Sequence, residues 1–321
     1  MVRKIVGVHN TREAFMLKYY KIENGRITKA SDEDSADIVL MGSPSQEQRG
    51  ALVKKYEIAE HTIASAFDND ELSRIEYDDD FTTIVFKKPR NYTSEDYFEF
   101  RVESFGIFLF EDWVLLLSDA EIPLMDSRRF SKIDSLNTFV IKLLNYSVYH
   151  FNEHLKIMNR INEELEDKLQ NSLDNRYLQY MFTLNKGLIY YVSALNSNEA
   201  LLKKLQMGRG MQFSENEREL LDDVVIENRQ SLQQAEIYAN ILASLMDARA
   251  SVVNNSMNVL MRTLNIVTIA ITLPTFVASI FGMNVKFPFG LGENNPYSFW
   301  IIIAIFVLSV AGVLFVWRKR K

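Results

Sequence analysis

The chain has 321 residues, of which 47% are apolar, and 36 basic against 42 acidic side chains give it a net charge of -6. It contains no cysteine, which excludes a disulfide scaffold, a cysteine-ligated zinc site and a thiol nucleophile. The acidic balance argues against a dedicated nucleic-acid-binding protein, because such proteins usually carry a basic domain.

Residues 1–125 predict an α/β domain on the cytoplasmic side, with a mixed or antiparallel sheet. Asn24-Gly25 indicates a hairpin and Glu111-Asp112 a turn. Short helices are expected at 45–56 and 60–68. Strand-like runs, rich in β-branched and aromatic residues, occur at 4–9, 15–22, 37–41, 82–87, 97–102 and 105–117.

Residues 126–210 predict two long antiparallel cytoplasmic helices, because the stretch 130–205 has a helical pattern and lacks proline. The expected interruption lies at 171–174, and Gly208 and Gly210 mark the break that follows the second helix. From Met211 there is neither glycine nor proline until Pro274, and Ser214 and Glu217 have the spacing of a capping box. A helix of this length exceeds an ordinary globular helix. We therefore expect a stalk helix over 211–262 that continues into the membrane.

Two uncharged segments predict a transmembrane hairpin at the C-terminal end of the chain. The segments 263–285 and 297–317 are each long enough to cross a hydrocarbon core about 30 Å thick. The short segment 286–296 would connect them outside the membrane, and 318–321 form a basic tail. The basic residues near the spans include Arg262 and Arg318, so the positive-inside rule places both termini in the cytoplasm of a cell (inner) membrane protein.

The first span and the turns before it carry a polar stripe at steps of three and four residues. In lipid such a stripe must face a partner helix or water. One interpretation is hydrogen-bonding contact between packed helices; the other is a water-filled pore around the axis of a homo-oligomer. Leu264 could replace its neighbour Asn265 after a small helix rotation, which would give an apolar gate. The stripe consists of Asn254, Asn258, Met261, Asn265, Thr268, Thr272, Thr275, Ser279 and Gly282.

This stripe has no carboxylate and no lysine. Mg2+ loses its water reluctantly and usually keeps several waters when it is bound. Neutral hydroxyls and amides can hydrogen-bond those waters weakly enough to let the ion leave again. The stripe therefore favours passage of a hydrated ion over capture of a bare one.

The first span ends in Gly282-Met283-Asn284, and with Asp247, Pro274, the second span and the basic tail the chain resembles the CorA family of magnesium transporters. The resemblance implies a homopentameric funnel whose first spans line the pore. It implies that Gly282 carbonyls and Asn284 side chains hold the hydrated ion, that Met283 packs the loop, and that Asp247 and Asn254 lie at the cytoplasmic pore mouth. In many family members an acid closely follows the signature. Here it is displaced to Glu293, with Lys286 opposing it, which leaves the ion preference open.

Two groups of acidic residues are candidates for regulation, although most acids in such groups simply form a solvated surface. The resemblance implies a regulatory Mg2+ site between neighbouring protomers. Asp223 matches the stalk position, with Asp222 and Glu227 beside it, and Asp68 or Asp70 matches the other position. The residues after Asp68 do not have the spacing of an EF-hand loop. Bound Mg2+ would hold the protomers closed, and loss of the ion would widen the pore.

His150 and His154 lie one helical turn apart, a spacing that could hold zinc. No further ligand is identifiable, so the sequence favours two surface histidines.

The sequence favours a passive channel for divalent cations, with Mg2+ as both transported and regulatory ion and with Co2+ and Ni2+ as further substrates. The expected partners are other copies of the chain, the lipid bilayer and divalent cations, with no nucleic acid and no nucleotide. One alternative is a zinc transporter of the same superfamily; another, of a different class, is a membrane-anchored sensor or scaffold. An enzyme is not expected, because no nucleophile–base arrangement and no phosphate-binding loop is found.

Overall fold

The computed structural model describes residues 17–42, 44–92, 98–120, 122–126, 128–171, 175–208, 210–283 and 297–319. It divides the chain into two compact units, Met1–Met246 and Asp247–Lys321. Some of the predicted features lie outside the described residues. These are the strand expected at 4–9, the signature residue Asn284, and Lys286 and Glu293 of the external loop.

The first unit contains a mixed seven-stranded sheet with the order β2-β1-β3-β7-β6-β5-β4. Neighbouring strands are antiparallel except for β3 and β7, which are parallel. A mixed sheet is one of the two arrangements that the sequence predicted. The strands are β1 (Leu17–Glu23), β2 (Arg26–Lys29), β3 (Ile38–Met41), β4 (Arg74–Tyr77), β5 (Thr82–Pro89), β6 (Val102–Leu109) and β7 (Val114–Ser118).

Both predicted turns are confirmed. Asn24 and Gly25 join β1 to β2 with φ of 50° and 70°, the left-handed conformation that a tight two-residue hairpin requires. The Glu111-Asp112 turn splits the apolar run 105–117 into β6 and β7. It is closed by a 2.9 Å hydrogen bond from Phe110 N to Trp113 O.

One predicted strand was wrong and one observed strand was missed. Residues 98–101 are not a strand, because Phe98 has a φ of 69° and Phe100 packs its ring against Tyr92, His154 and Tyr191. Conversely, β4 was missed, because this edge strand buries only Ile75 and so gives a weak apolar signal.

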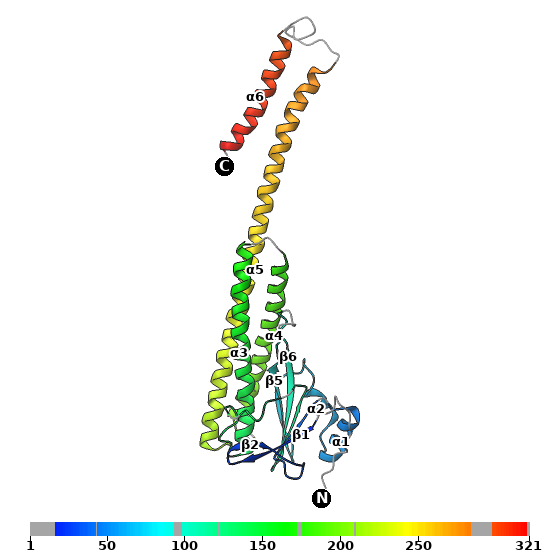
Figure 1. The fold of residues 1–321 in the computed structure, drawn as a ribbon, viewed down its shortest axis with the longest axis vertical. Helices are drawn as coiled ribbons and strands as arrows, with labels where there is room; N and C mark the ends of the chain where they lie inside the picture. The colour runs from blue at the N-terminus through cyan, green and yellow to red at the C-terminus, as the bar shows by residue number, and fades with distance from the viewer. Residues whose placement is uncertain are drawn as a thin grey trace. The chain divides into compact units, whose positions relative to one another are not determined.

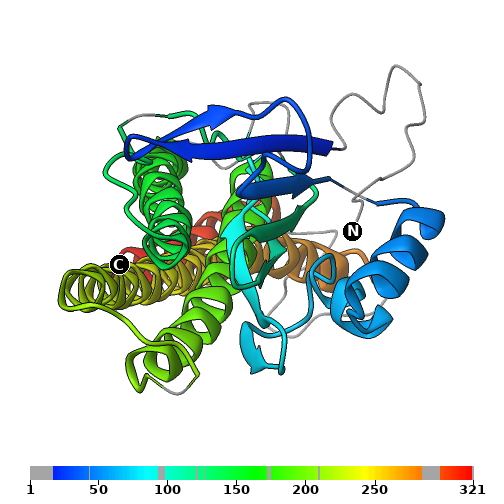
Figure 2. The same cartoon turned by 90° about the horizontal axis from the view of Figure 1, so that it is seen from below.

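Helices α1 (Gln46–Tyr56) and α2 (Glu60–Ser65) cover one face of the sheet. The other face packs against α3 (Leu136–Asn171), α4 (Asn175–Gln206) and the first part of α5 (Glu215–Phe281), as Figures 1 and 2 show for this unit. Alternation along β7 supplies both cores: Leu115 and Leu117 face α1 and α2, whereas Val114 and Leu116 face the long helices. A third core lies among α3, α4 and α5.

The helix boundaries follow local signals. The Ser214–Glu217 capping box is confirmed: Ser214 N lies 2.8 Å from Glu217 Oε2, and Glu217 N lies 3.4 Å from Ser214 Oγ. α3 ends at Asn171 and α4 begins at Asn175, and residues 172–174 of the expected interruption lie outside the described residues. The glycine break is confirmed by φ of 65° at Gly208 and 85° at Gly210. α3 begins at 136 rather than 130.

The expectation of two surface histidines was wrong for His154, and His150 is half-buried. His154 is only 5% exposed, and its Nδ1 lies 2.6 Å from the hydroxyl oxygen of the buried Tyr191. The His150 ring lies 4.5 Å from the His154 ring. Burial, the largest cause for both, lowers the pKa of His150 to about 3 and that of His154 to about 4. Among the described residues these histidines belong to no group of metal-ligating side chains.

The second unit consists of the rest of α5 and of α6 (Ser298–Lys319). α5 is a helix of 67 residues with Pro274 inside it, so the stalk and the first predicted span form one element. Among the described residues α5 contains an apolar window long enough to cross a membrane, and only 6% of that window is buried within the chain. A core helix of a soluble protein would be mostly buried.

Candidate ion pathway and regulatory acids

The polar stripe lies along the exposed surface of α5. Residues three and four apart share one face of an α-helix, so the stripe positions project from a common side. Its apolar members are Met261, 51% exposed, and the alternative residue Leu264, 57% exposed. The other exposed members are Asn254, Asn258, Asn265, Thr268, Thr272, Thr275, Ser279 and Gly282.

Two stripe threonines satisfy their hydroxyl protons within the helix. Thr268 Oγ1 donates to Leu264 O at 2.9 Å, and Thr275 Oγ1 donates to Ile271 O at 2.7 Å. Each hydroxyl oxygen keeps lone pairs that accept a hydrogen bond from outside the helix. The waters around a cation point their protons outward, so these oxygens complement the surface of a hydrated ion.

The end of α5 presents Gly282 and Met283. Gly282 N donates to Ala278 O at 3.0 Å, and Met283, 57% exposed, follows directly. A Cβ built on Gly282 would meet nothing closer than two carbonyl oxygens at 3.5 Å, an ordinary contact. Among the described residues, therefore, no packing contact requires glycine at this position.

The predicted regulatory acids lie on two separate elements of the first unit. Asp68 and Asp70 are exposed in the loop after α2, where Asp68 Oδ1 accepts a hydrogen bond from Asp70 N at 2.9 Å. Asp222 and Asp223 are exposed on α5, and Gln206 Nε2 donates to Asp222 Oδ1 at 2.6 Å.

Glu227 is half-buried one turn after Asp223, and its pKa is raised by burial and, second, by the Asp223 charge. Carboxylate oxygens are the ligands that Mg2+ prefers, so this donor chemistry fits the ion. Among the described residues, however, no three metal-ligating side chains come together within the single chain. Asp247 lies exposed further along α5.

The structure also positions residues 68–73, called the Asp68 loop below, by contacts that sequence reasoning missed. Gly106 on β6 allows α2 to come close, because a Cβ at Gly106 would lie 2.6 Å from Ala66 Cβ. Lys87 on β5 is only 4% exposed, and its ammonium group donates a hydrogen bond to the loop backbone at Asn69 O. The sequence signal that could have indicated this buried lysine is the pair Lys87 and Lys88 at the end of an apolar strand.

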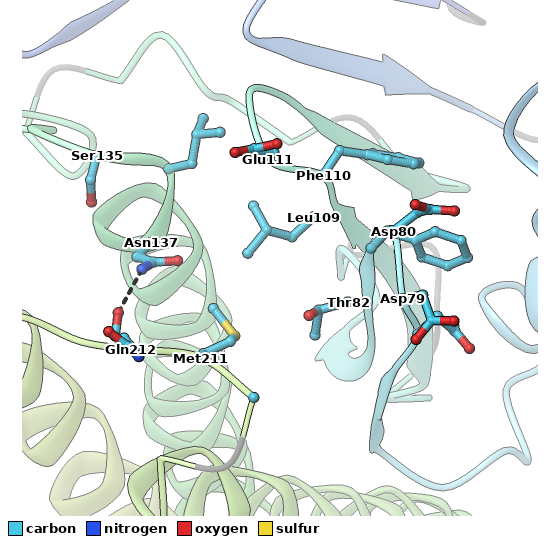
Figure 3. A pocket seen from close by; sticks show the side chains of 14 residues that line it. Asp79, Asp80, Thr82, Leu109, Phe110, Glu111, Ser135, Asn137, Met211 and Gln212 are labelled. Atoms are coloured by element: carbon cyan, nitrogen blue, oxygen red, sulfur yellow. Dashed lines mark hydrogen bonds between the residues drawn. The ribbon is translucent and has the colours of Figure 1, made fainter.

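An acidic cavity of about 630 Å3 lies at another place in the first unit (Figure 3). Asp79 and Asp80 from the β4–β5 turn and Glu111 from the β6–β7 turn line it, together with Asn137 and Gln212. Asn137 Nδ2 donates to Gln212 O at 3.1 Å. It contains none of the predicted site residues.

Comparison with known proteins decides the family. The model of the CorA-like Mg2+ transporter protein family matches residues 36–319, most of the chain. The chain belongs to this family. It is therefore an ion transporter embedded in a membrane, not an enzyme. The resemblance noted at Gly282-Met283-Asn284 is confirmed over nearly the whole length.

Individual relatives agree with the family assignment. The chain is 27% identical over 286 residues to the cobalt/magnesium transport protein CorA of Methanocaldococcus jannaschii, covering 86% of this chain and 88% of that protein. The complete structure of the CorA magnesium transporter from the same organism matches with a TM-score of 0.79 and 22% identity, over 99% of each chain. The α/β domain with long helices is thus a CorA fold.

The cytoplasmic domain of ZntB from Vibrio parahaemolyticus also matches, with a TM-score of 0.58 and 12% identity, over 75% of this chain and 99% of that one. At this identity the likeness concerns the fold alone. It gives the zinc alternative no additional support.

Proposed function

We propose that the chain forms a passive channel for hydrated Mg2+, with Co2+ and Ni2+ as further cargo, in which copies of α5 surround a common axis. The observation that carries the proposal is the uncharged polar stripe of α5, where Thr268 and Thr275 place their hydroxyl protons within the helix and leave acceptors outside. A hydrated cation passes such acceptors without losing its inner waters. An inside-negative potential favours entry of a doubly charged ion by about 4.6 kcal/mol per 100 mV, so influx needs no ATP.

The proposed assembly is a homopentameric funnel in the cell (inner) membrane, with two spans per chain and both termini in the cytoplasm. A ring of Gly282 carbonyls and Asn284 side chains captures the ion at the outer end, and Glu293 contributes from the external loop. Asp247 and Asn254 lie at the cytoplasmic mouth. Leu264 and Asn265 are adjacent and both exposed, so a small rotation of α5 exchanges an apolar gate for a polar surface.

Regulation in this proposal comes from Mg2+ between neighbouring protomers. Asp223, with Asp222 and Glu227, faces Asp68 or Asp70 of the next chain. Carboxylates held together repel one another until a cation bridges them. Because the bridged state binds the ion better, internal Mg2+ shifts the population toward the closed arrangement. Among the described residues no three metal-ligating side chains come together within one chain, which supports a site that needs two copies.

The ring is tested by Asn284→Ala in the reconstituted full chain, with Mg2+ uptake followed by an indicator inside vesicles. We expect uptake to fall to background, because the ring loses its amide oxygens. Asn255→Ala is the matched control: Asn255 is an exposed asparagine of α5 beside the stripe, and its loss should change uptake less than twofold. Full uptake by Asn284→Ala would contradict the proposal.

The same vesicles separate the alternatives. Cobalt(III) hexaammine mimics a hydrated ion and should block wild-type Mg2+ uptake. Zn2+ uptake that this complex does not block would favour a zinc transporter. This alternative is considered because the acid that follows the signature is displaced to Glu293 and is opposed by Lys286. A chain that moves neither ion would favour the sensor or scaffold.

A further inference from the structure

The Asp68 loop, residues 68–73, accepts hydrogen bonds from the buried ammonium group of Lys87. Lys87 Nζ donates to Asn69 O at 2.8 Å, to Ser104 Oγ at 2.8 Å and toward Asp68 O at 3.5 Å. A lysine has three N–H donors, so these acceptors account for all of them. Two of the three acceptors are backbone carbonyls of the loop.

The loop is fixed at both of its ends. At the start, Ser104 Oγ donates to Asp68 O at 2.6 Å and Ser104 N donates to Asn69 Oδ1 at 3.3 Å. At the end, Ser73 N donates to Ser197 Oγ and Ser73 Oγ donates to Asn198 Oδ1, both at 2.6 Å. β6 thus holds one end and α4 the other.

Between these anchors the loop presents Asp68 and Asp70 to solvent. Burial lowers the pKa of Lys87, while the negative charges of Asp68, Asp70 and Glu71 oppose that change. A buried charge that loses its partners is costly, so these contacts hold the loop backbone in one arrangement.

We propose that Lys87 is the positioning residue for the Asp68/Asp70 half of the intersubunit Mg2+ site. Its ammonium group holds the loop backbone through Asn69 O and Asp68 O and is itself held by Ser104 Oγ. The inference rests on the regulation proposed above. A site preorganised in this way binds its ion without first ordering the loop, because the entropy cost is met during folding.

The test measures Mg2+ uptake of the full chain in vesicles against internal Mg2+ and compares the concentration for half-maximal closure. Lys87→Met should raise this concentration about tenfold. Ser104→Ala, a smaller change at the same contact, should raise it about threefold and serves where Lys87→Met does not fold. Lys87→Arg, which keeps the charge and several donors, should restore most of the response.

The matched control is Lys88→Met. Lys88 is also buried on β5, but it pairs with Glu103 rather than with the loop. Its loss should lower thermal stability and leave the half-closing Mg2+ concentration unchanged. A merely structural role of Lys87 would make the two lysine variants behave alike, which would overturn the proposal.

Three further results would overturn it. If the wild type closes and Asp70→Asn shifts the response while Lys87→Met and Ser104→Ala do not, only the positioning role fails. That role also fails if Lys87→Met lowers the half-closing concentration, since repulsion by the lysine charge would then outweigh positioning. If the wild type does not respond to internal Mg2+, the proposed regulation fails, and the inference fails with it.

Discussion

At the scale of single residues, the most unusual groups are ionisable side chains buried in the first unit. His154 and Tyr191 are buried between α3 and α4 with the half-buried His150 beside them, and Lys88 and Glu103 form a buried ion pair across β5 and β6. Such groups persist because each has a partner. They also make the stability of this unit depend on pH.

Acid should destabilise the chain through the two histidines. Their folded pKa values, about 3 and about 4, lie below the ordinary 6.5, so the unfolded chain binds more protons between about pH 4 and 6.5. The free energy of unfolding should therefore fall as pH falls through this window, by up to about 1.4 kcal/mol per pH unit for each histidine. Below about pH 3 this contribution levels off.

Thermal unfolding of the full chain in detergent, followed by tryptophan fluorescence at several pH values, checks this. His150→Phe should remove about half of the slope. His61→Ala, at an exposed histidine of α2, should leave it unchanged. If the free energy of unfolding of wild type and of His150→Phe changed equally with pH, the destabilisation by acid would not come from His150.

At the scale of elements, α5 carries both the stalk and the candidate pore face. Threonines on the stripe and away from it make the same kind of hydrogen bond to the backbone of the preceding turn. Thr263 Oγ1 donates to Val259 O at 2.9 Å, just as Thr268 Oγ1 donates to Leu264 O. The helical repeat places Thr263 on the side opposite the stripe. The two positions therefore differ in direction and not in local chemistry.

Thr268→Val should lower Mg2+ uptake three- to tenfold, because the isosteric side chain removes an acceptor from the proposed path. Thr263→Val should leave uptake unchanged within twofold. The measurement is vesicle uptake normalised to the amount of inserted protein. Equal losses in both variants would mean that the hydroxyls stabilise the helix rather than contact the ion.

At the scale of the whole molecule, the absence of cysteine makes the proposed assembly accessible to crosslinking. Full chains carrying Asp68→Cys with Asp223→Cys should form disulfides between protomers, because no other thiol competes. Ladders of linked chains on a denaturing gel are the expected result, and each single variant is the control. A purely intramolecular disulfide would contradict a site between protomers. Asp70→Cys tests the alternative acid.

The agreement between sequence and structure depends on the range of the interactions involved. The Asn24-Gly25 hairpin and the Ser214–Glu217 cap were predictable, because a turn and a helix start depend on residues a few positions apart. β4 was missed because its edge position leaves a single buried side chain.

The sequence by itself determined the long apolar stretch of α5, the stripe on that helix and the family, because hydropathy, helical period and a short signature are local properties of the chain. Only the tertiary structure decided that His154 is buried and that Lys87 supports the Asp68 loop. These facts depend on contacts between residues far apart, such as Ser73 and Asn198, 125 positions from each other. A local pattern shows which face of a strand or helix is apolar, but it does not show which distant element will cover that face.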